Sequence, residues 1–450
     1  MIKDLHFIGF IFVVPIIIGF LFFIYYFDKP LTGDALQYDL LGWNLAQGNG
    51  YSLSVNTPYE PTMLREPFYP SFLACLYTLF GHRIFVVYIV QILLFSITCV
   101  FSFLIAKEIF GEKVAKYSVL LTAFCPTLVN YAMLLYSENV FIFLFILTIY
   151  FFICAYVNNR DIKWFIVSGF LLALTTLCKG IMSFFFIFFI ILIYLNAKSF
   201  IDFLKGYTLK IILFLLIFLI TVSPWIIRNY NLFGILNLNA TGSWALLSRV
   251  YRSNYPIEKL KASGVYYFSE YLGSKLYPNV FSPAKDAMLE QGHLLIQREK
   301  QLQEQGLTLR EIRDIFRKEA TYLIKKHPFR FIFTTPLELM RLMAFMHIPI
   351  LNDNCLIDKF KNIKNGALIL SLIRGSYRII AYPLIFLVIF SIYLYRAQWR
   401  KNLIVLAPVL YINLLYSLLS GYPRYSVPLI PFYLMFGTAA VMGISERRGH

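Results

Sequence analysis

The chain has 450 residues, of which 59% are hydrophobic and only 14% are charged. A soluble domain carries about 25% charged residues, so a chain this apolar would expose far too much hydrophobic surface to water, and a lipid bilayer is its natural solvent. The net charge of +17 is spread mostly over short loops between apolar runs. This distribution indicates topogenic charge and attraction to anionic lipid head groups, and it argues against nucleic acid as a partner.

The first apolar run, from Ile8 to Phe27, contains no charged residue. It is too long for the core of a signal peptide, and no small-residue cleavage site follows it, so we expect a retained transmembrane helix. Further apolar runs bring the predicted number of spans to about ten. They lie near residues 8–27, 84–105, 117–136, 139–157, 164–178, 181–195, 211–227, 376–395, 402–419 and 426–444. The shorter apolar stretch from Phe68 to Phe80 is expected at the membrane interface.

Lysine and arginine in short loops predict which side of the membrane each loop faces. With a cytoplasmic N-terminus, the inner loops contain most of these cations: Lys107, Lys113, Lys116, Arg160, Lys163, Lys198, Lys205, Lys210, Arg396, Arg400, Lys401, Arg447 and Arg448. Both termini are therefore predicted to be cytoplasmic. We expect a transmembrane module over residues 1–228 with a first outer loop at 28–83, an extracytoplasmic segment at 229–374, and C-terminal transmembrane helices at 375–450.

The segment 229–374 is the only extended stretch with a composition like that of a soluble protein. Thr308 and Glu311 have the spacing of a capping box, which predicts a helix starting there and ending at His327-Pro328. The next piece, from Phe329 to His347, is apolar with a few charges, and we expect it to lie along the membrane surface. The predicted fold is therefore all-α, with a polytopic bundle, outer loops and interfacial helices.

The six cysteines lie mostly in apolar runs and none forms a C-x-x-C pair, which favours neither a disulfide framework nor a zinc site. They are Cys75, Cys99, Cys125, Cys154, Cys178 and Cys355.

Polar residues at span ends and in turns converge on the outer side in this topology. They are Asp34, Arg65, Glu66, Glu138, Lys179, Arg228 and Arg424. Snorkelling charges would scatter over both faces, and cations would prefer the inner one. The set therefore predicts an outward-facing polar pocket rimmed with cations, which suits a phosphate.

Asp34 follows the first span by a few residues, so it is held near the membrane surface. A carboxylate there can take a proton from an attacking hydroxyl or bind a divalent metal ion. The alternative is that Asp34 only caps a helix starting at Ala35. The guanidinium of Arg65 can bind a phosphate, and Glu66 is a second candidate carboxylate. The local sequence is equally compatible with a plain surface ion pair formed by these residues.

These segments resemble the GT-C superfamily, and within it the dolichyl-phosphate-mannose protein mannosyltransferases and their bacterial relatives, including the aminoarabinose transferases that act on lipid A. The resemblance rests on an ordered set of motifs. They are Gly33-Asp34, Gly48-Asn49-Gly50-Tyr51, Arg65-Glu66-Pro67-Phe68-Tyr69-Pro70, Ser137-Glu138, Leu174 to Gly180, Pro224 to Tyr230 with Phe233-Gly234, His327-Pro328, and Tyr422-Pro423-Arg424-Tyr425 with Pro428 and Pro431. The segment 235–325 matches poorly.

The resemblance implies a GT-C bundle and an enzyme that transfers a sugar from a polyprenyl-phosphate donor to an extracytoplasmic acceptor, most often with inversion, in the plasma (inner) membrane of a prokaryote. Asp34 would be the base, and Glu66 would assist it or bind metal or acceptor. The donor phosphate would contact Arg65, Lys179, Arg228 and Arg424, with Glu138 and Tyr69 as further pocket residues. Whether a divalent metal ion binds at Asp34 and Glu66 stays open. The acceptor also stays open, because the sequence shows no sign of the distinct outer module that eukaryotic protein mannosyltransferases carry.

Two other functions remain as alternatives. A flippase or transporter of lipid-linked sugars should have ionisable residues near the bilayer midplane and repeated halves, yet the spans are almost free of charge. A non-enzymatic protein of envelope assembly would need no outer carboxylate beside a ring of cations.

Overall fold

The computed structural model describes all residues except 1, 28, 159–160, 198, 281–286, 344–362, 364–365 and 449–450. Arg160, Lys198 and Cys355 therefore lie outside the described residues. The regular secondary structure of the described chain is helical, apart from an isolated β-bridge between Ser52 and Pro61. The five described cysteines are free.

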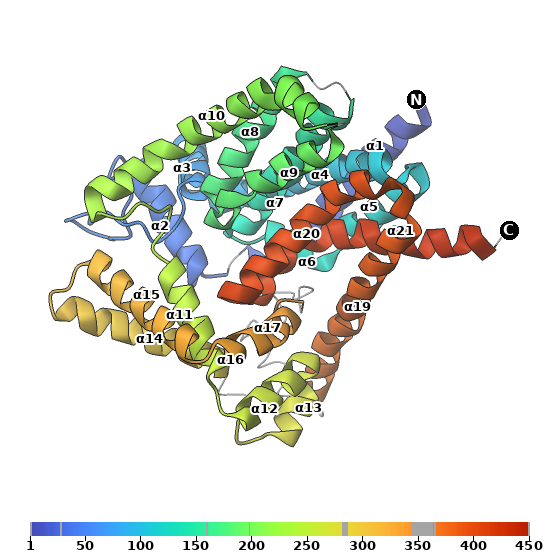
Figure 1. Cartoon of the computed structure of the whole chain (residues 1–450). Coiled ribbons are helices and arrows are strands. Elements are labelled where there is room, and N and C mark those ends of the chain that lie inside the picture. The colour runs from blue at the N-terminus through green and yellow to red at the C-terminus, as the bar shows by residue number, and fades with distance from the viewer. Residues whose placement is uncertain are drawn as a thin grey trace. The chain divides into compact units, whose positions relative to one another are not determined.

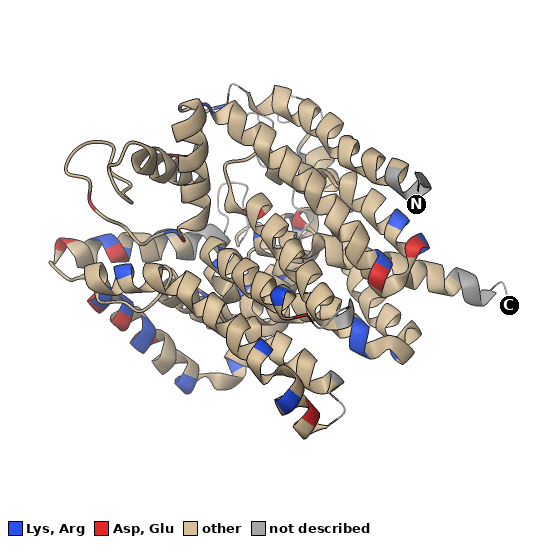
Figure 2. Ribbon diagram, turned by 90° about the horizontal axis from the view of Figure 1, so that it is seen from above, with Lys and Arg blue, Asp and Glu red and all other residues tan. Residues whose placement is uncertain are grey.

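Among the described residues, six helices are long and apolar enough to cross a membrane, so the protein is an integral multi-pass membrane protein. They are His6–Tyr26, Ile84–Phe110, Ser137–Tyr156, Phe200–Phe233, Arg396–Leu419 and Pro423–Ile444. Four further apolar helices are shorter: Phe68–Phe80, Ile162–Cys178, Gly180–Leu195 and Arg378–Leu394. Figure 2 shows helices that are free of charged residues over most of their length. The structure thus supports six clear spans where the sequence predicted about ten.

The predicted span 117–136 is wrong as a single helix. The helix α5 ends at Ala123, and α6 begins at Pro126 after a break at Phe124 and Cys125. Proline lacks the amide proton that a continuous helix needs, and it disfavours helical backbone at the residue before it. Pro126 is therefore the physical reason for the break.

The chain forms two compact units, whose helices are labelled in Figure 1. The first comprises Met1–Leu232, Leu384–Tyr411 and Pro428–His450. Its helices are α1 (Ile2–Tyr26), α2 (Asp34–Ala46), α3 (Phe68–Phe80), α4 (Ile84–Phe110), α5 (Glu112–Ala123), α6 (Pro126–Ala132), α7 (Ser137–Ile153), α8 (Ile162–Cys178), η2 (Gly180–Phe184), α9 (Phe186–Asn196), α10 (Phe200–Phe233) and α21 (Ile430–Arg448), with parts of α19 (Gly366–Leu394) and α20 (Trp399–Leu419).

Two helices at the centre of the first unit organise its packing. α4 packs against α1, α5 and α7, and α7 also packs against α8. The aromatic side chains of Phe141, Phe145 and Phe152 on α7 are fully or almost fully buried. Inside a bilayer such side chains stabilise the fold mainly by van der Waals packing, because lipid tails are as apolar as the side chains themselves. Because α4 rises about 1.5 Å per residue, its two ends lie on the order of 40 Å apart.

The second unit comprises Phe233–Pro383 and Ile412–Val427. It contains α11 (Gly242–Ser253), α12 (Ile257–Phe268), α13 (Glu270–Leu276), α14 (Ala287–Glu304), α15 (Leu309–Lys326), α16 (Pro328–Phe333), α17 (Thr335–Leu342), the remaining parts of α19 and α20, and most of the 3-10 helix η5 (Pro423–Leu429). A small core forms between α11, α14 and α15 around Leu247, Ile312 and Phe316.

The predicted capping box of α15 is confirmed. The Thr308 hydroxyl accepts from the Glu311 amide, and the Glu311 carboxylate accepts from the Thr308 amide. The helix ends at Lys326 before His327-Pro328, as predicted. On the following α16, the side chains of Phe329, Ile332 and Phe333 are exposed, and their placement at the membrane surface stays a prediction.

Membrane sidedness can be tested at two exposed positions of the first unit. A cysteine placed at Thr57, in the loop between α2 and α3, should react with an impermeant thiol reagent added to intact cells, because residues 28–83 are predicted outside. A cysteine at Lys113, at the start of α5, should react only after permeabilisation. A background without native cysteines is the control, since Cys75 is exposed. The reverse labelling pattern would invert the topology.

Candidate active site

The first turn of α2 presents Asp34 at the surface of the first unit. The N-cap of this helix is Gly33, whose φ of 57° is a conformation that glycine adopts readily, and Asp34 is the first helical residue. The alternative in which Asp34 caps a helix starting at Ala35 is therefore wrong in its register. The Asp34 carboxylate forms an ion pair with Arg65, and its side chain is 25% exposed. It is both held in place and accessible.

Arg65 is fixed by one face of α2. Besides Asp34, its Nε and Nη2 donate to Oε1 of Gln37 at 3.1 and 2.7 Å. Its guanidinium also lies 5.1 Å from the ring centroid of Tyr38. Asp34, Gln37 and Tyr38 are spaced i, i+3 and i+4, so their side chains share one helix face. This spacing is the sequence signal that could have identified Gln37, which the sequence analysis did not name.

Glu66 connects the first loop to the turn after α8. Its Oε1 accepts the backbone N–H of Gly180 at 2.8 Å. The hydroxyl of Tyr51 lies 3.0 Å from the carbonyl oxygens of both Arg65 and Glu66. The Arg65-Glu66 pair is thus held by segments that come from distant parts of the sequence, and both side chains are only partly buried.

Glu138 and Lys179 form a buried ion pair between α7 and the end of α8. Nζ of Lys179 donates to Oε1 of Glu138 at 2.8 Å, and the two side chains are 11% and 2% exposed respectively. Next to Glu138, the hydroxyl of Ser137 accepts from the phenol of Tyr38 at 3.2 Å. The residue next to Glu138 thus contacts the helix that presents Asp34.

Removing one member of this buried pair should be costly. We expect Lys179→Met to destabilise the protein by about 3–5 kcal/mol, because it leaves Glu138 buried without its cation. The double variant Lys179→Met with Glu138→Leu should recover most of that loss. As a matched control, Lys116→Met removes the exposed ion pair to Glu112 and should cost at most about 1 kcal/mol. Thermal unfolding in detergent provides the comparison, and equal shifts for Lys179→Met and Lys116→Met would contradict it.

Arg228, near the end of α10, contacts the first loop. Its Nη1 donates to the carbonyl oxygen of Thr62 at 3.1 Å and to Oδ1 of Asn229 at 2.9 Å. Its guanidinium lies 4.4 Å from the ring of Trp225 and 5.3 Å from that of Tyr51. Two aromatic rings and neutral oxygens thus hold the guanidinium in a fixed orientation.

The pKa values of the Tyr38 and Tyr51 phenols are shifted by burial and by the neighbouring charges. Burial raises the pKa of Tyr38, the charge of Arg65 opposes this shift, and Glu66 and Glu138 add to it. Burial likewise raises the pKa of Tyr51, with a further contribution from Glu66 and opposition from Arg228. Both phenols therefore stay protonated at neutral pH and act as hydrogen-bond donors.

Tyr69 lies behind this region and not on its surface. Its side chain is fully buried, its hydroxyl donates to Oε1 of Gln91 at 2.8 Å, and its ring meets Tyr38 edge-on at 4.9 Å. Gln91, also fully buried, in turn donates to the carbonyl oxygens of Ala132 and Leu134. In this structure Tyr69 supports Tyr38 from within the core.

A carboxylate that the sequence analysis did not single out, Asp39, also fastens α2. Its Oδ1 accepts from the hydroxyl of Tyr77 at 2.6 Å and contacts Nε2 of His82 at 2.8 Å. The imidazole of His82 stacks on Trp43 at 4.6 Å. These contacts join α2 to α3 and to the turn before α4, so they fix the helix that presents Asp34.

The first unit thus brings together six of the predicted site residues, which we call the loop site: Asp34, Arg65, Glu66, Glu138, Lys179 and Arg228. The seventh charged residue, Arg424, lies on η5 in the second unit, where its guanidinium is 5.6 Å from the ring of Tyr425. Within the described residues, no group of three or more His, Cys, Asp or Glu could hold a metal ion.

Residues 61–227 match the model of the family described as dolichyl-phosphate-mannose-protein mannosyltransferase. This match confirms the resemblance inferred from the sequence. The matched segment contains Arg65, Glu66, Glu138 and Lys179. Arg228 directly follows its last residue, whereas Asp34 lies well before its first residue. None of the curated protein sequences matches the chain.

Two of the solved structures that match this chain align over almost all of its residues. The archaeal oligosaccharyltransferase AglB from Archaeoglobus fulgidus, in complex with an inhibitory peptide and a dolichol-phosphate, aligns with a TM-score of 0.52 at 12% identity over 98% of this chain. This chain spans 50% of that structure, and the similarity concerns the fold alone. ArnT from Cupriavidus metallidurans, bound to undecaprenyl phosphate, aligns at 12% identity over 96% of this chain and 76% of its own, with a TM-score of only 0.40.

Proposed function

We propose that this protein is a membrane glycosyltransferase that transfers a sugar from a polyprenyl-phosphate-linked donor to an acceptor outside the cytoplasm. The observation that carries the proposal is the Asp34 carboxylate, which is partly exposed and forms an ion pair with Arg65. Arg65 lies near the start of the segment that matches the family model. The dolichol-phosphate named with AglB supports a donor of this class.

Asp34 has the role of general base in this proposal. An acceptor hydroxyl oxygen forms a bond to the anomeric carbon of the sugar while its proton passes to the Asp34 carboxylate. The bond between the anomeric carbon and the phosphate oxygen breaks, and polyprenyl phosphate leaves with the electron pair. Because this is a single displacement, the anomeric centre inverts. Arg65, which is itself held by Gln37, keeps the carboxylate oriented during proton transfer.

The leaving group is a stable phosphate anion, so it needs cations more than it needs a general acid. Arg228 is the strongest candidate in the first unit, because its guanidinium is only half-buried and is oriented by Trp225 and Tyr51. Arg65 and Lys179 would contribute positive charge from their ion pairs with Asp34 and Glu138. Arg424 is proposed as a further phosphate ligand on its Tyr-Pro-Arg-Tyr motif alone.

The loop site contains carboxylates that could hold a divalent metal ion. Mg²⁺ binds through one or two carboxylates while substrate phosphates and water complete its octahedron, and Asp34 and Glu66 are the carboxylates that could serve. Such an ion would neutralise phosphate charge. Measuring donor affinity before and after chelation with EDTA tests whether a metal ion takes part in donor binding. An unchanged affinity would mean that the basic side chains bind the phosphate without a metal ion.

The donor class can be tested by binding before any acceptor is known. Polyprenyl phosphate should raise the thermal unfolding midpoint of the purified protein in detergent, whereas the matching polyprenyl alcohol should not, because the cations recognise the phosphate. An equal shift with both lipids would mean that only the prenyl chain is recognised and would contradict the proposal.

A further inference from the structure

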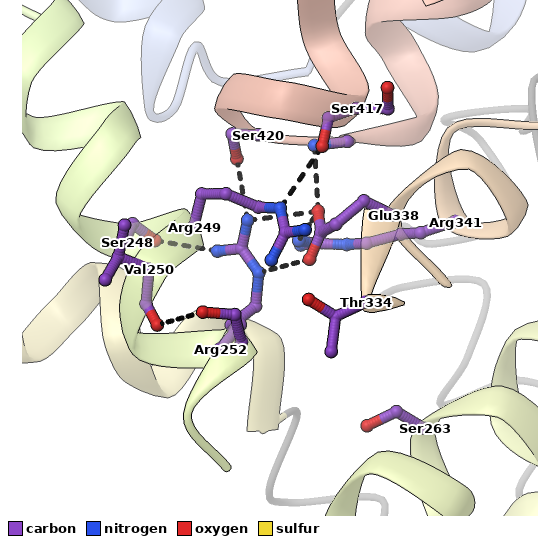
Figure 3. Close-up of polar contacts among 12 residues, drawn as sticks. Ser248, Arg249, Val250, Arg252, Ser263, Thr334, Glu338, Arg341, Ser417 and Ser420 are labelled. Carbon is purple, nitrogen blue, oxygen red and sulfur yellow. Dashed lines mark hydrogen bonds and ion pairs between the residues drawn. The ribbon is translucent and has the colours of Figure 1, made fainter. Parts of the chain in front are cut away.

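A buried polar cluster in the second unit joins α11, α17 and the turn that follows α20 (Figure 3). We call it the Glu338 cluster; it consists of Arg252, Glu338, Arg341, Ser420 and Gly421. Nε of Arg252 donates to Oε1 of Glu338 at 2.8 Å, and its Nη2 donates to Oε2 at 3.1 Å. The backbone N–H of Gly421 donates to the same Oε2 at 3.0 Å.

Burial makes this cluster rigid. The side chains of Arg252 and Glu338 are each 5% exposed, and ions this deeply buried are retained only with close partners. Burial alone would raise the pKa of Glu338, but the guanidinium groups of Arg252, Arg341 and Arg249 outweigh it and hold that pKa at about 2. Glu338 is therefore a carboxylate at any physiological pH and can accept the Gly421 N–H permanently.

The turn is held against α17 by further contacts. A Cβ atom on Gly421 would lie 2.3 Å from the carbonyl oxygen of Glu338, so only glycine fits this close approach. Next along the chain, the ring of Tyr422 lies 5.3 Å from the guanidinium of Arg341. After the turn, the hydroxyl of Ser426 donates to the carbonyl oxygen of Leu342. Both ends of the Tyr422-to-Tyr425 motif are thus fastened to one helix.

We propose that Glu338 is a positioning residue that sets the place of Arg424 by holding Gly421 and the turn that follows it. The inference rests on the proposed function, in which Arg424 binds the donor phosphate. Glu338 itself is buried and does not touch the donor. Glu338 affects donor binding only through the position of the turn. Removing Glu338 should therefore weaken donor affinity only while Arg424 is present.

The test compares three variants in donor binding and in hydrogen exchange of the Gly421 amide. Glu338→Gln alone leaves Arg252 and Arg341 buried without a carboxylate and endangers the fold. Arg252→Met with Glu338→Leu removes the close two-contact pair, and only the longer 3.7 Å contact of Arg341 then loses its carboxylate. We expect this double variant to fold, to lose protection of the Gly421 amide, and to weaken donor affinity roughly 10- to 100-fold, the same loss that we expect for Arg424→Ala. Arg317→Ala, at an exposed ion pair of α15, is the control and should change neither readout.

The decisive comparison adds Arg424→Ala to the double variant. If Glu338 acts through Arg424, the triple variant should bind the donor no more weakly than Arg424→Ala alone. Additive losses, or a Gly421 amide that stays protected without Glu338, would overturn the inference. If Arg424→Ala binds normally while the wild-type protein transfers sugar, the inference fails and the proposed function stands. If the wild-type protein neither binds the donor nor transfers its sugar, both the inference and the proposed function are contradicted.

Discussion

Replacing Asp34 with asparagine should lower turnover by roughly 10²–10⁴, the usual contribution of a general base. Asparagine keeps the size and the hydrogen-bonding oxygen of the side chain but cannot accept the proton of the acceptor hydroxyl. The fold should survive, because Gly33 and not Asp34 is the N-cap of α2. Losing a favourable charge in the first helical turn costs only about 0.3–1 kcal/mol. Initial rates of sugar transfer at saturating donor provide the measurement.

The control for Asp34→Asn is Glu60→Gln, which removes an exposed carboxylate from the same loop and should leave turnover unchanged. Turnover of Asp34→Asn within a few-fold of the parent would exclude Asp34 as the base. Glu66 would then be the next candidate, although its Oε1 already accepts the Gly180 N–H. Glu66→Gln measured in the same series separates these two carboxylates.

Replacing Arg228 with alanine should weaken donor binding by roughly 1.5–3 kcal/mol, the typical value of one charge-assisted contact to a phosphate. Arg228→Lys should retain part of the affinity, because the charge stays while the planar stacking on Trp225 and Tyr51 is lost. Titration of the purified variants with a polyprenyl-phosphate sugar gives both dissociation constants.

Lys210→Ala provides a matched control for Arg228, since it removes a cation from the other half of the same helix, α10. It should not change donor affinity. If Arg228→Ala folds normally and binds the donor as tightly as the parent, Arg228 has no role in phosphate recognition.

Local sequence signals predicted local structure well. The capping box at Thr308 and Glu311 was predictable because the contacting groups are three residues apart. The break before Pro126 could also have been predicted, since proline inside an apolar run is a known interruption. The length of an apolar run is a weaker guide: the helix predicted at 211–227 extends over Phe200–Phe233, and several expected spans are short helices.

The partners within the loop site were not predictable from the sequence. Asp34 and Arg65 are separated by 31 positions, and Glu138 and Lys179 by 41. Their pairing depends on how α2, α7 and α8 pack, which no local pattern encodes. The sequence therefore identified these residues as one outer set of charges, but it treated Lys179 as a phosphate ligand and did not foresee that Glu138 holds it in the interior. Its role in donor binding stays a proposal.

Sugar transfer by the purified protein tests the central proposal most directly. A donor with a radiolabelled sugar on polyprenyl phosphate is incubated with the protein in vesicles and with acceptor fractions from the cell envelope. We predict that the label leaves the lipid and joins an acceptor with the wild-type protein, and that Asp34→Asn lowers this rate at least 100-fold. Movement of intact labelled lipid across the vesicle without release of the sugar, equal for both proteins, would contradict the account and favour a transporter.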